Sequence, residues 1–236
     1  MSRLYAIPDI HGRADLLAVL LEKLTAEESF DPREDKLIFL GDMIDRGPDS
    51  KTVVENIRRL CQAFPNVIAL RGNHETLCID AHTSPTSNEK IELWMWNGGG
   101  PTVKSWGGEI PHDVLEWIES LPLYHEEPGF FFSHAPAPRE RLRKDHLRGK
   151  PFDLNELTWT YSPDEFGVAR VHDNGVIGVC GHIHALQRGS AKPRFYDHYI
   201  FADAGCGCSP RAPLVAIEVR SRKVVTAHPD ELEATE

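Results

Sequence analysis

Five short polar clusters in this sequence each follow directly after an apolar run of the length of a β-strand. The apolar runs are residues 4–8, 37–40, 67–70, 130–132 and 176–180, and the clusters that follow them read DIHG, GDMIDRG, RGNHE, SHA and GHIH. In α/β sheets, residues beyond the carboxyl ends of the strands line the ligand-binding edge. The pattern therefore predicts a sheet architecture in which Asp, His and Asn side chains meet at one edge.

The order of strand-like and helix-like segments predicts how the sheets are built. Helical periodicity over residues 14–25 and 50–63 alternates with strands over 4–8, 36–40 and 67–70, which is typical of a largely parallel sheet with right-handed crossovers. Residues 91–108 suggest a helix end and a loop, and 111–120 a short helix. From residue 129 onward strands dominate, over 129–133, 175–180, 195–201, 214–219 and 223–226. We expect two sheets packed together with helices outside.

Length and charge limit the classes of function. With 236 residues, the chain is expected to form a single domain, residues 1–236. Its net charge of −10 disfavours nucleic acid and anionic lipid as partners, and no apolar run approaches the length of a membrane span. A short apolar stretch at the N-terminus and five cysteines without a framework spacing favour a cytoplasmic protein with reduced thiols. A substrate that carries phosphate would need a local cationic site, which bound metal could supply.

The residues in the five clusters have the types and spacing of metal ligands. Asp9 and His11 are two positions apart, so an extended segment would project both to the same side, and the same holds for His182 and His184. A carboxylate such as Asp42 can bridge two cations, and mixed Asp, His and Asn ligation favours manganese, iron or zinc over calcium. A lone His after a strand is usually structural, but five clusters at five strand exits are hard to explain as turns. The candidate ligands are Asp9, His11, Asp42, Asn73, His134, His182 and His184.

In their order and their residues, these motifs resemble those of the PPP-type metallophosphatases of the calcineurin-like phosphoesterase superfamily, including the bacterial serine/threonine phosphatases. The resemblance runs from Asp9 to about Cys206. It implies an α/β fold with a central β-sandwich of two mixed sheets flanked by helices. It also implies two divalent metal ions, with manganese expected and iron or zinc as alternatives. The first metal would be held by Asp9 and His11 and the second by Asn73, His134 and His182, with Asp42 as the bridge.

The same resemblance assigns the remaining catalytic roles. Arg46 would bind the phosphoryl oxygens together with Asn73, and His74, oriented by Asp45, would act as the general acid toward the leaving group. Two cations a few ångströms apart would lower the pKa of a bridging water, so that a bridging hydroxide attacks phosphorus. A protonated His would then supply the leaving-group proton.

Two of the departures from the family pattern concern metal and substrate binding. PPP phosphatases usually lack a second histidine after the GH motif, whereas the broader superfamily uses it on the first metal, so we hypothesise that His184 is a ligand; the alternative is a histidine that supports the ligands or faces solvent. PPP protein phosphatases also carry a phosphate-binding Arg just after a Trp. Tyr161, in the sequence Trp159-Thr160-Tyr161, stands nearest to that position and could bind substrate in its place. Candidates to compensate for the missing charge are Arg143, Arg148 and Arg170.

Three functions stay open at this point. The leading one is a bacterial-type phosphoprotein phosphatase that acts on phosphorylated Ser and Thr, with dual specificity that includes phosphotyrosine as an option. Small phosphoesters would also be substrates. The second is a symmetrical bis(5'-nucleosyl)-tetraphosphatase, a branch that usually has Ala where Asp45 stands. The third is an inactive metal-binding scaffold, which the presence of His74 and of every matched ligand disfavours. The basic run over residues 139–150 (RERLRKDHLRGK) is either a solvated helix face or a rim that attracts phosphorylated substrates.

Overall fold

The computed structural model describes residues 2–84, 86–137, 153–160, 176–184 and 191–233. The strands are β1 Leu4–Ile7, β2 Lys36–Phe39, β3 Val67–Ala69, β4 Tyr124–Glu127, β5 Phe130–Ser133, β6 Ile177–Cys180, β7 Arg194–Phe195, β8 Tyr199–Phe201, β9 Leu214–Glu218 and β10 Lys223–Ala227. The helices are α1 Ala14–Ala26, α2 Ser50–Ala63, α3 Asn73–Thr83, α4 Asn88–Trp96, α5 Gly99–Ser105, α6 His112–Ser120, α7 Leu154–Thr158 and α8 Asp230–Glu233.

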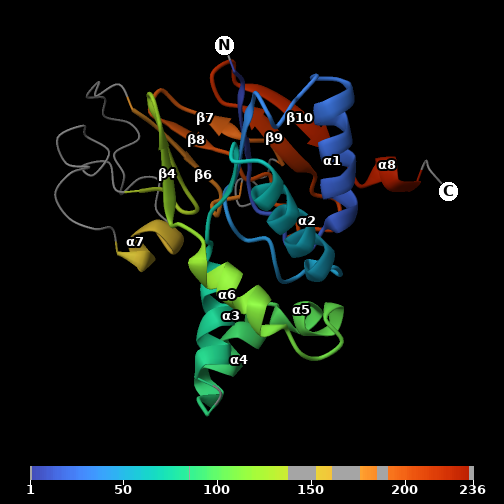
Figure 1. Ribbon diagram of the computed structural model, residues 1–236, viewed down its shortest axis with the longest axis vertical. Coiled ribbons are helices and arrows are strands. Elements are labelled where there is room, and N and C mark those ends of the chain that lie inside the picture. The colour runs from blue at the N-terminus through green and yellow to red at the C-terminus, as the bar shows by residue number, and fades with distance from the viewer. Residues whose placement is uncertain (1, 85, 138–152, 161–175, 185–190, 234–236) are drawn as a thin grey trace.

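The strands form two five-stranded mixed sheets (Figure 1). In the first sheet, ordered β10-β9-β1-β2-β3, strands β1, β2 and β3 run parallel, and β9 pairs antiparallel with both β1 and β10. In the second, ordered β4-β5-β6-β8-β7, strands β5, β6 and β8 run parallel between antiparallel edge strands. The predicted pair of mixed sheets flanked by helices is therefore confirmed, and each sheet contributes three parallel strand ends.

Side chains along β1 point alternately to the two faces of the first sheet. On β1, Leu4 and Ala6 face the cluster between the sheets, where they pack with side chains such as Phe132 of β5. Tyr5 and Ile7 point to the opposite face and join the helices that cover the first sheet. All four side chains are buried, so β1 is enclosed on both faces. Figure 1 shows α1 and α2 alongside this sheet, and α3 to α6 in a projection at its lower end.

Two local expectations about secondary structure were wrong. The single strand expected over 195–201 is a hairpin of β7 and β8. The segment 91–108 contains a second helix, α5, which follows Gly98 with a φ of +104°, a left-handed conformation that glycine adopts without strain.

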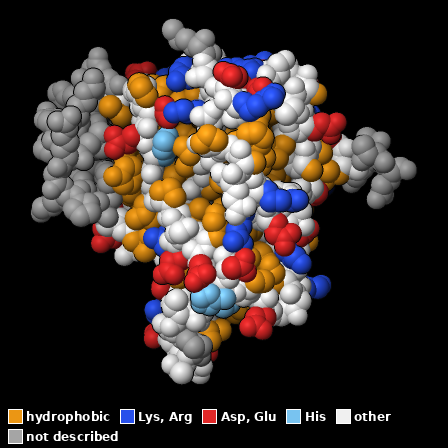
Figure 2. Space-filling view, in the orientation of Figure 1, with side chains coloured by type: hydrophobic (Ala, Val, Ile, Leu, Met, Phe, Trp, Pro, Cys, Tyr) orange, Lys and Arg blue, Asp and Glu red, His pale blue; other side chains and the backbone are white. Residues whose placement is uncertain are grey.

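The surface matches the acidic composition. Acidic side chains gather on the visible face over the projection formed by α3 to α6 (Figure 2). Among the described residues, no helix is long and apolar enough to cross a membrane.

Candidate functional site

The loops that leave the strands turn sharply into the site. His11, Asp42 and His182 have φ values of 46°, 52° and 58°, in the left-handed region that side chains rarely adopt. Such strain is typical of functional sites, where the surrounding structure maintains it. Gly72 makes one close approach possible, because a Cβ there would lie 2.1 Å from Oδ1 of Asp42.

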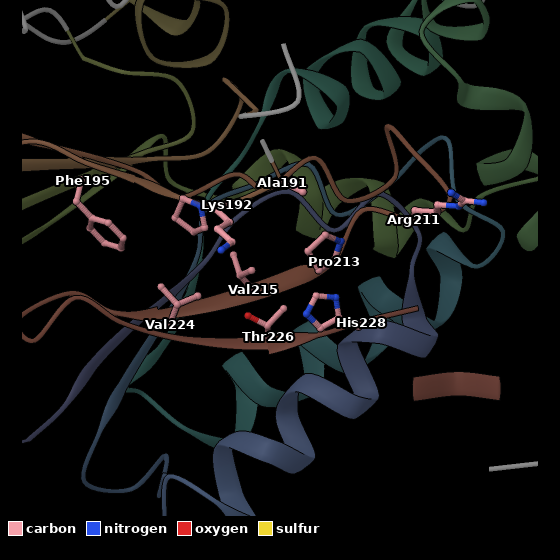
Figure 3. Close-up of a pocket in the computed structure, with 10 residues that line it drawn as sticks. Ala191, Lys192, Phe195, Arg211, Pro213, Val215, Val224, Thr226 and His228 are labelled. Carbon is pink, nitrogen blue, oxygen red and sulfur yellow. The ribbon is translucent and has the colours of Figure 1, made fainter. Parts of the chain in front are cut away.

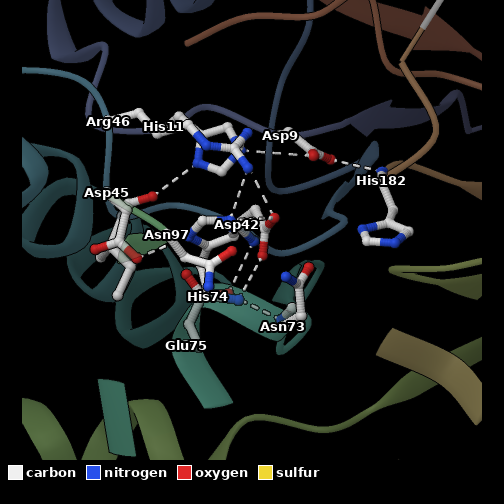
Figure 4. A network of polar contacts seen from close by, with 12 residues as sticks. Asp9, His11, Asp42, Asp45, Arg46, Asn73, His74, Glu75, Asn97 and His182 are labelled. Atoms are coloured by element: carbon white, nitrogen blue, oxygen red, sulfur yellow. Dashed lines mark hydrogen bonds and ion pairs between the residues drawn. The ribbon is translucent and has the colours of Figure 1, made fainter. Parts of the chain in front are cut away.

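The Asp42 carboxylate lies at the centre of the cluster (Figure 4). Its Oδ2 is 3.6 Å from Nε2 of His11 and 3.4 Å from Nε2 of His134. Two groups with metal-ligand geometry share this carboxylate: His11, Asp42 and His74 form one, and Asp42, His134 and His182 the other. All of these side chains are buried. The arrangement is a candidate metal-binding cluster with Asp42 common to both halves.

The histidine tautomers fit a metal. Nδ1 of His11 lies 2.8 Å from the carbonyl of Ile44, and Nδ1 of His134 lies 2.9 Å from that of Leu40. Each Nδ1–H therefore donates to a carbonyl, which leaves the Nε2 lone pair facing Asp42. Nε2 of His134 also lies 2.8 Å from Oδ1 of Asn73, so two acceptor atoms face each other. A cation between them would accept electron pairs from both, so the donor set fits a metal ion.

The other predicted ligands lie around this centre. Oδ1 of Asp9 accepts a hydrogen bond from the His182 amide at 2.9 Å, and its Oδ2 is 3.8 Å from Nε2 of His11. Nδ1 of His182 is 3.2 Å from Nε2 of His134. His184 is half-buried and lines the same small pocket as Asp9 and His182. The structure thus brings all seven candidate ligands to one place.

Burial controls the protonation of the cluster. It lowers the pKa of His11 and of His182 well below the ordinary histidine value, with neighbouring histidines adding to the effect. It raises the pKa of Asp42 well above the usual range, and the charge of Asp9 reinforces this. Neutral imidazoles are the form that binds metal. The lowered pKa values therefore favour the neutral, metal-binding form of His11 and His182 at neutral pH.

Arg46, His74 and Asp45 form a connected group beside the cluster. The Arg46 guanidinium donates to Nε2 of His11 at 2.7 Å and to Nε2 of His74 at 3.0 Å. It also contacts Sγ of Cys208 at 2.9 Å. Nδ1 of His74 donates to Oδ2 of Asp45 at 2.7 Å. Hydrogen bonds thus connect the residue predicted to bind the phosphoryl group, Arg46, with the predicted acid, His74, and its orienting partner, Asp45.

Two buried acids at the site were missed from the sequence. The Glu75 carboxylate accepts hydrogen bonds from the backbone amides of Asp42, Met43 and Gly72, each at 2.8 Å, and so anchors the loop after β2. Asp203 follows β8, and burial, reinforced by Asp9, raises its pKa well above the usual range. The signal for Asp203 was present, because it follows a sixth apolar run in the same way as the other clusters.

Most of the candidate ligands line a small polar pocket together with Arg46 and His74. The small pocket has a volume of about 50 Å³ and is lined by Asp9, Asp42, Arg46, Asn73, His74, Asn97, His182 and His184. A pocket of about 480 Å³ lies elsewhere, over β9 and β10, and its lining includes Phe195, Val215, Lys192 and His228 (Figure 3). None of the carboxylates or histidines of the candidate metal cluster lines this second pocket.

Some predicted residues lie outside the described part of the chain: Tyr161, Arg143, Arg148, Arg170 and the basic run over 139–150. Trp159, two positions before Tyr161, lies close to the cluster, with its ring centroid 6.4 Å from that of His182.

Comparison with known proteins identifies the family. The model for calcineurin-like phosphoesterases matches residues 2–186. The chain is 38% identical over 158 residues to serine/threonine-protein phosphatase 1 of Salmonella typhimurium, covering 66% of this chain and 67% of that protein. It is 30% identical over 135 residues to the symmetrical bis(5'-nucleosyl)-tetraphosphatase of Methylococcus capsulatus, covering 57% of this chain and 43% of that protein. The solved metallophosphoesterase from Sphaerobacter thermophilus shares the fold, with a TM-score of 0.55 and 20% identity over 96% of this chain and 87% of that one. This chain therefore belongs to the calcineurin-like phosphoesterases, a family of hydrolases, and its relatives include bacterial serine/threonine phosphatases.

Proposed function

We propose that this chain is a dinuclear-metal phosphoesterase that hydrolyses phosphate monoesters, with phosphoproteins as its substrates. The observation that carries the proposal is the position of Asp42, which is shared by two buried groups of potential ligands. A single carboxylate between two sets of imidazole nitrogens is suited to bridging two cations. We further propose that residues 1–236 act as one catalytic unit.

The donor set divides between two metal positions. We assign Asp9, His11 and His184 to the first and Asn73, His134 and His182 to the second, with Asp42 common to both. Bound there, two divalent ions would lower the pKa of a water molecule and neutralise charge on the phosphoryl oxygens. Nitrogen and oxygen ligands without thiolates suit manganese, with iron or zinc as alternatives.

Arg46 is proposed to bind the phosphoryl group. Its guanidinium donates to Nε2 of His11, and that lone pair can serve either the guanidinium or a cation. If His11 used that lone pair to hold a cation, the Arg46 guanidinium would be free to bind another acceptor. A phosphoryl group in the same pocket offers planar pairs of oxygens that match the guanidinium fork.

His74 is proposed to protonate the leaving group through Nε2. The hydrogen bond from Nδ1 to Asp45 holds the ring and leaves Nε2 on the side of the pocket. Burial, followed by the charge of Arg46, lowers the pKa of His74 to about 3. A phosphoryl dianion bound to Arg46 would offset that charge and favour a proton on Nε2.

His74→Asn is expected to reduce kcat for phenyl phosphate by about 10²- to 10³-fold, because general acid catalysis typically contributes this much. The loss for 4-nitrophenyl phosphate should be much smaller, since nitrophenolate leaves without a proton. Steady-state kinetics on both substrates at equal metal content measures the difference. Equal losses on the two substrates would argue against an acid role for His74.

His184→Ala is expected to weaken the affinity for one of two manganese ions by at least about tenfold, since losing a ligand should cost no less than losing a supporting contact. Metal titration by calorimetry, with His112→Ala on the exposed surface as the matched control, measures the change. Full occupancy and unchanged affinity in His184→Ala would remove His184 from the ligand set.

The choice of substrate depends on Asp45 and on the segment around Tyr161. Asp45 favours a phosphoprotein phosphatase, because the symmetrical tetraphosphatases usually have Ala at that position. Tyr161 favours the tetraphosphatase to a lesser degree, because it stands where protein phosphatases carry Arg. Relatives with either name are similar to this chain, so both functions have to be tested.

One comparison separates these functions. The manganese-loaded protein is assayed for phosphate release from phosphoserine and phosphothreonine peptides, and for nucleotide release from diadenosine tetraphosphate. We expect higher kcat/KM on the peptides. Higher kcat/KM on the dinucleotide would replace the phosphatase with the tetraphosphatase, and inactivity on both would favour a metal-binding scaffold.

A further inference from the structure

The Asp45 carboxylate accepts hydrogen bonds from three side chains on three different helices. Besides His74 of α3, Trp94 of α4 donates its Nε1–H to both oxygens, at 3.1 and 3.0 Å. Thr102 of α5 donates its hydroxyl to Oδ1 at 2.6 Å. Asp45 and Thr102 are fully buried and Trp94 is 2% exposed, so these donors replace the water that a carboxylate would otherwise bind.

The hydroxyl of Thr102 has a defined orientation. It carries one proton, which goes to Oδ1 of Asp45, so the contact with Oγ of Ser50 at 2.9 Å must be a hydrogen bond donated by Ser50. The Thr102 oxygen also accepts from the Asp45 amide at 2.9 Å. Thr102 therefore contacts both the backbone and the carboxylate of Asp45, and fixes their relative position.

Packing holds the Trp94 indole in place. A Cβ at Gly99 would lie 2.7 Å from Cε2 of Trp94, so the backbone at the start of α5 lies directly against the ring. The His82 ring packs edge-on with its centroid 5.3 Å away. The indole N–H thus points at Asp45 from a rigid position.

The donors also act on the charge of Asp45. Burial raises the pKa of Asp45 to about 7, even though the hydrogen bonds from Thr102 and then Trp94, together with the charge of Arg46, act to lower it. Without these hydrogen bonds, the neutral carboxyl would be favoured near neutral pH. A neutral carboxyl holds an imidazole N–H more weakly than a carboxylate does.

We propose that Trp94 and Thr102 are positioning residues for the acid step: their donors fix the Asp45 carboxylate, which in turn holds His74 with Nε2 toward the leaving group. This inference rests on the proposed function, because it requires His74 to be the acid. Neither residue touches the substrate pocket, so substrate binding should be independent of them.

The test compares Thr102→Val, which keeps the shape and removes the hydroxyl, with Thr102→Ser, which keeps the hydroxyl. Thr102→Val is expected to lower kcat for phenyl phosphate by about tenfold, with little change in KM. The loss is smaller than that expected for removing the acid itself, because His74 is still present. The loss for 4-nitrophenyl phosphate should be smaller, and Thr102→Ser should recover most of the activity. Trp94→Phe, which removes the N–H and keeps an aromatic ring, should repeat the pattern. Thr83→Val, whose hydroxyl bonds the Ile79 carbonyl, serves as the control.

Wild-type kcat for phenyl phosphate in both Thr102→Val and Trp94→Phe would overturn the proposal, as would equal losses on the two substrates at full metal content. Failure of the proposed acid role is distinguishable, because His74→Asn would then show no dependence on the leaving group. If His74→Asn shows that dependence and the Trp94 and Thr102 variants do not, this inference alone is wrong.

Discussion

Replacing Asp42 with Asn is expected to abolish the binding of at least one metal ion and to lower kcat/KM by about 10³-fold or more, a loss of at least about 4 kcal/mol of transition-state stabilisation. The Asp42 carboxylate lies within 3.6 Å of Nε2 of both His11 and His134, so it serves both halves of the cluster. Asn has nearly the same shape and removes the charge that two cations would share. Metal content after dialysis against manganese, and activity on phenyl phosphate, measure the two effects.

The fold itself should tolerate this change. Burial, then Asp9 and Glu75, raise the pKa of Asp42 well above the ordinary range, so the metal-free fold favours a neutral group there. Metal-free Asp42→Asn should therefore unfold at a temperature no lower than the metal-free wild type. Asp80→Asn, half-exposed and 3.5 Å from Lys90, is the matched control and should keep both metals. Two tightly bound ions in Asp42→Asn would contradict the bridging role.

The fold and the convergence of the candidate metal ligands could be predicted because they depend on regular patterns. An apolar run ends in Asp, His or Asn at each parallel strand, and parallel strands bring such ends together. Asp9 and His11 converge, but the extended segment that their spacing predicts is wrong, because His11 has a φ of 46°.

The residues that support the site could not be predicted, because their roles depend on tertiary contacts. Trp94 and Thr102 lie in the segment 91–108, which suggested a helix end and a loop, and only the packing of α4 and α5 directs them to Asp45. Glu75 was visible within RGNHE, yet nothing local indicates that its carboxylate reaches back to the loop after β2. Periodicity reports which face of an element is buried, and it does not report such distant partners.

Glu75→Ala is expected to destabilise the metal-free protein by about 3–5 kcal/mol, which corresponds to a Tm lower by about 10 °C for a chain of this size. The carboxylate accepts the backbone amides of Asp42, Met43 and Gly72, and Glu75 is fully buried. Removing it leaves three buried N–H groups without acceptors, and each costs about 1–3 kcal/mol. Thermal unfolding in the presence of a chelator measures this effect separately from any loss of bound metal.

Two further variants separate lost hydrogen bonds from lost volume. Glu75→Gln keeps nearly the same shape, and its carbonyl can replace Oε2, which accepts from Asp42 and Gly72, while its NH₂ faces the amide of Met43. It should therefore cost about 1–3 kcal/mol, less than Glu75→Ala. Glu92→Ala on the exposed side of α4 should stay within about 0.5 kcal/mol of the wild type. If Glu75→Ala matched Glu92→Ala, the carboxylate would not anchor the Asp42 loop, and that loop would have to owe its left-handed turn to contacts other than Glu75.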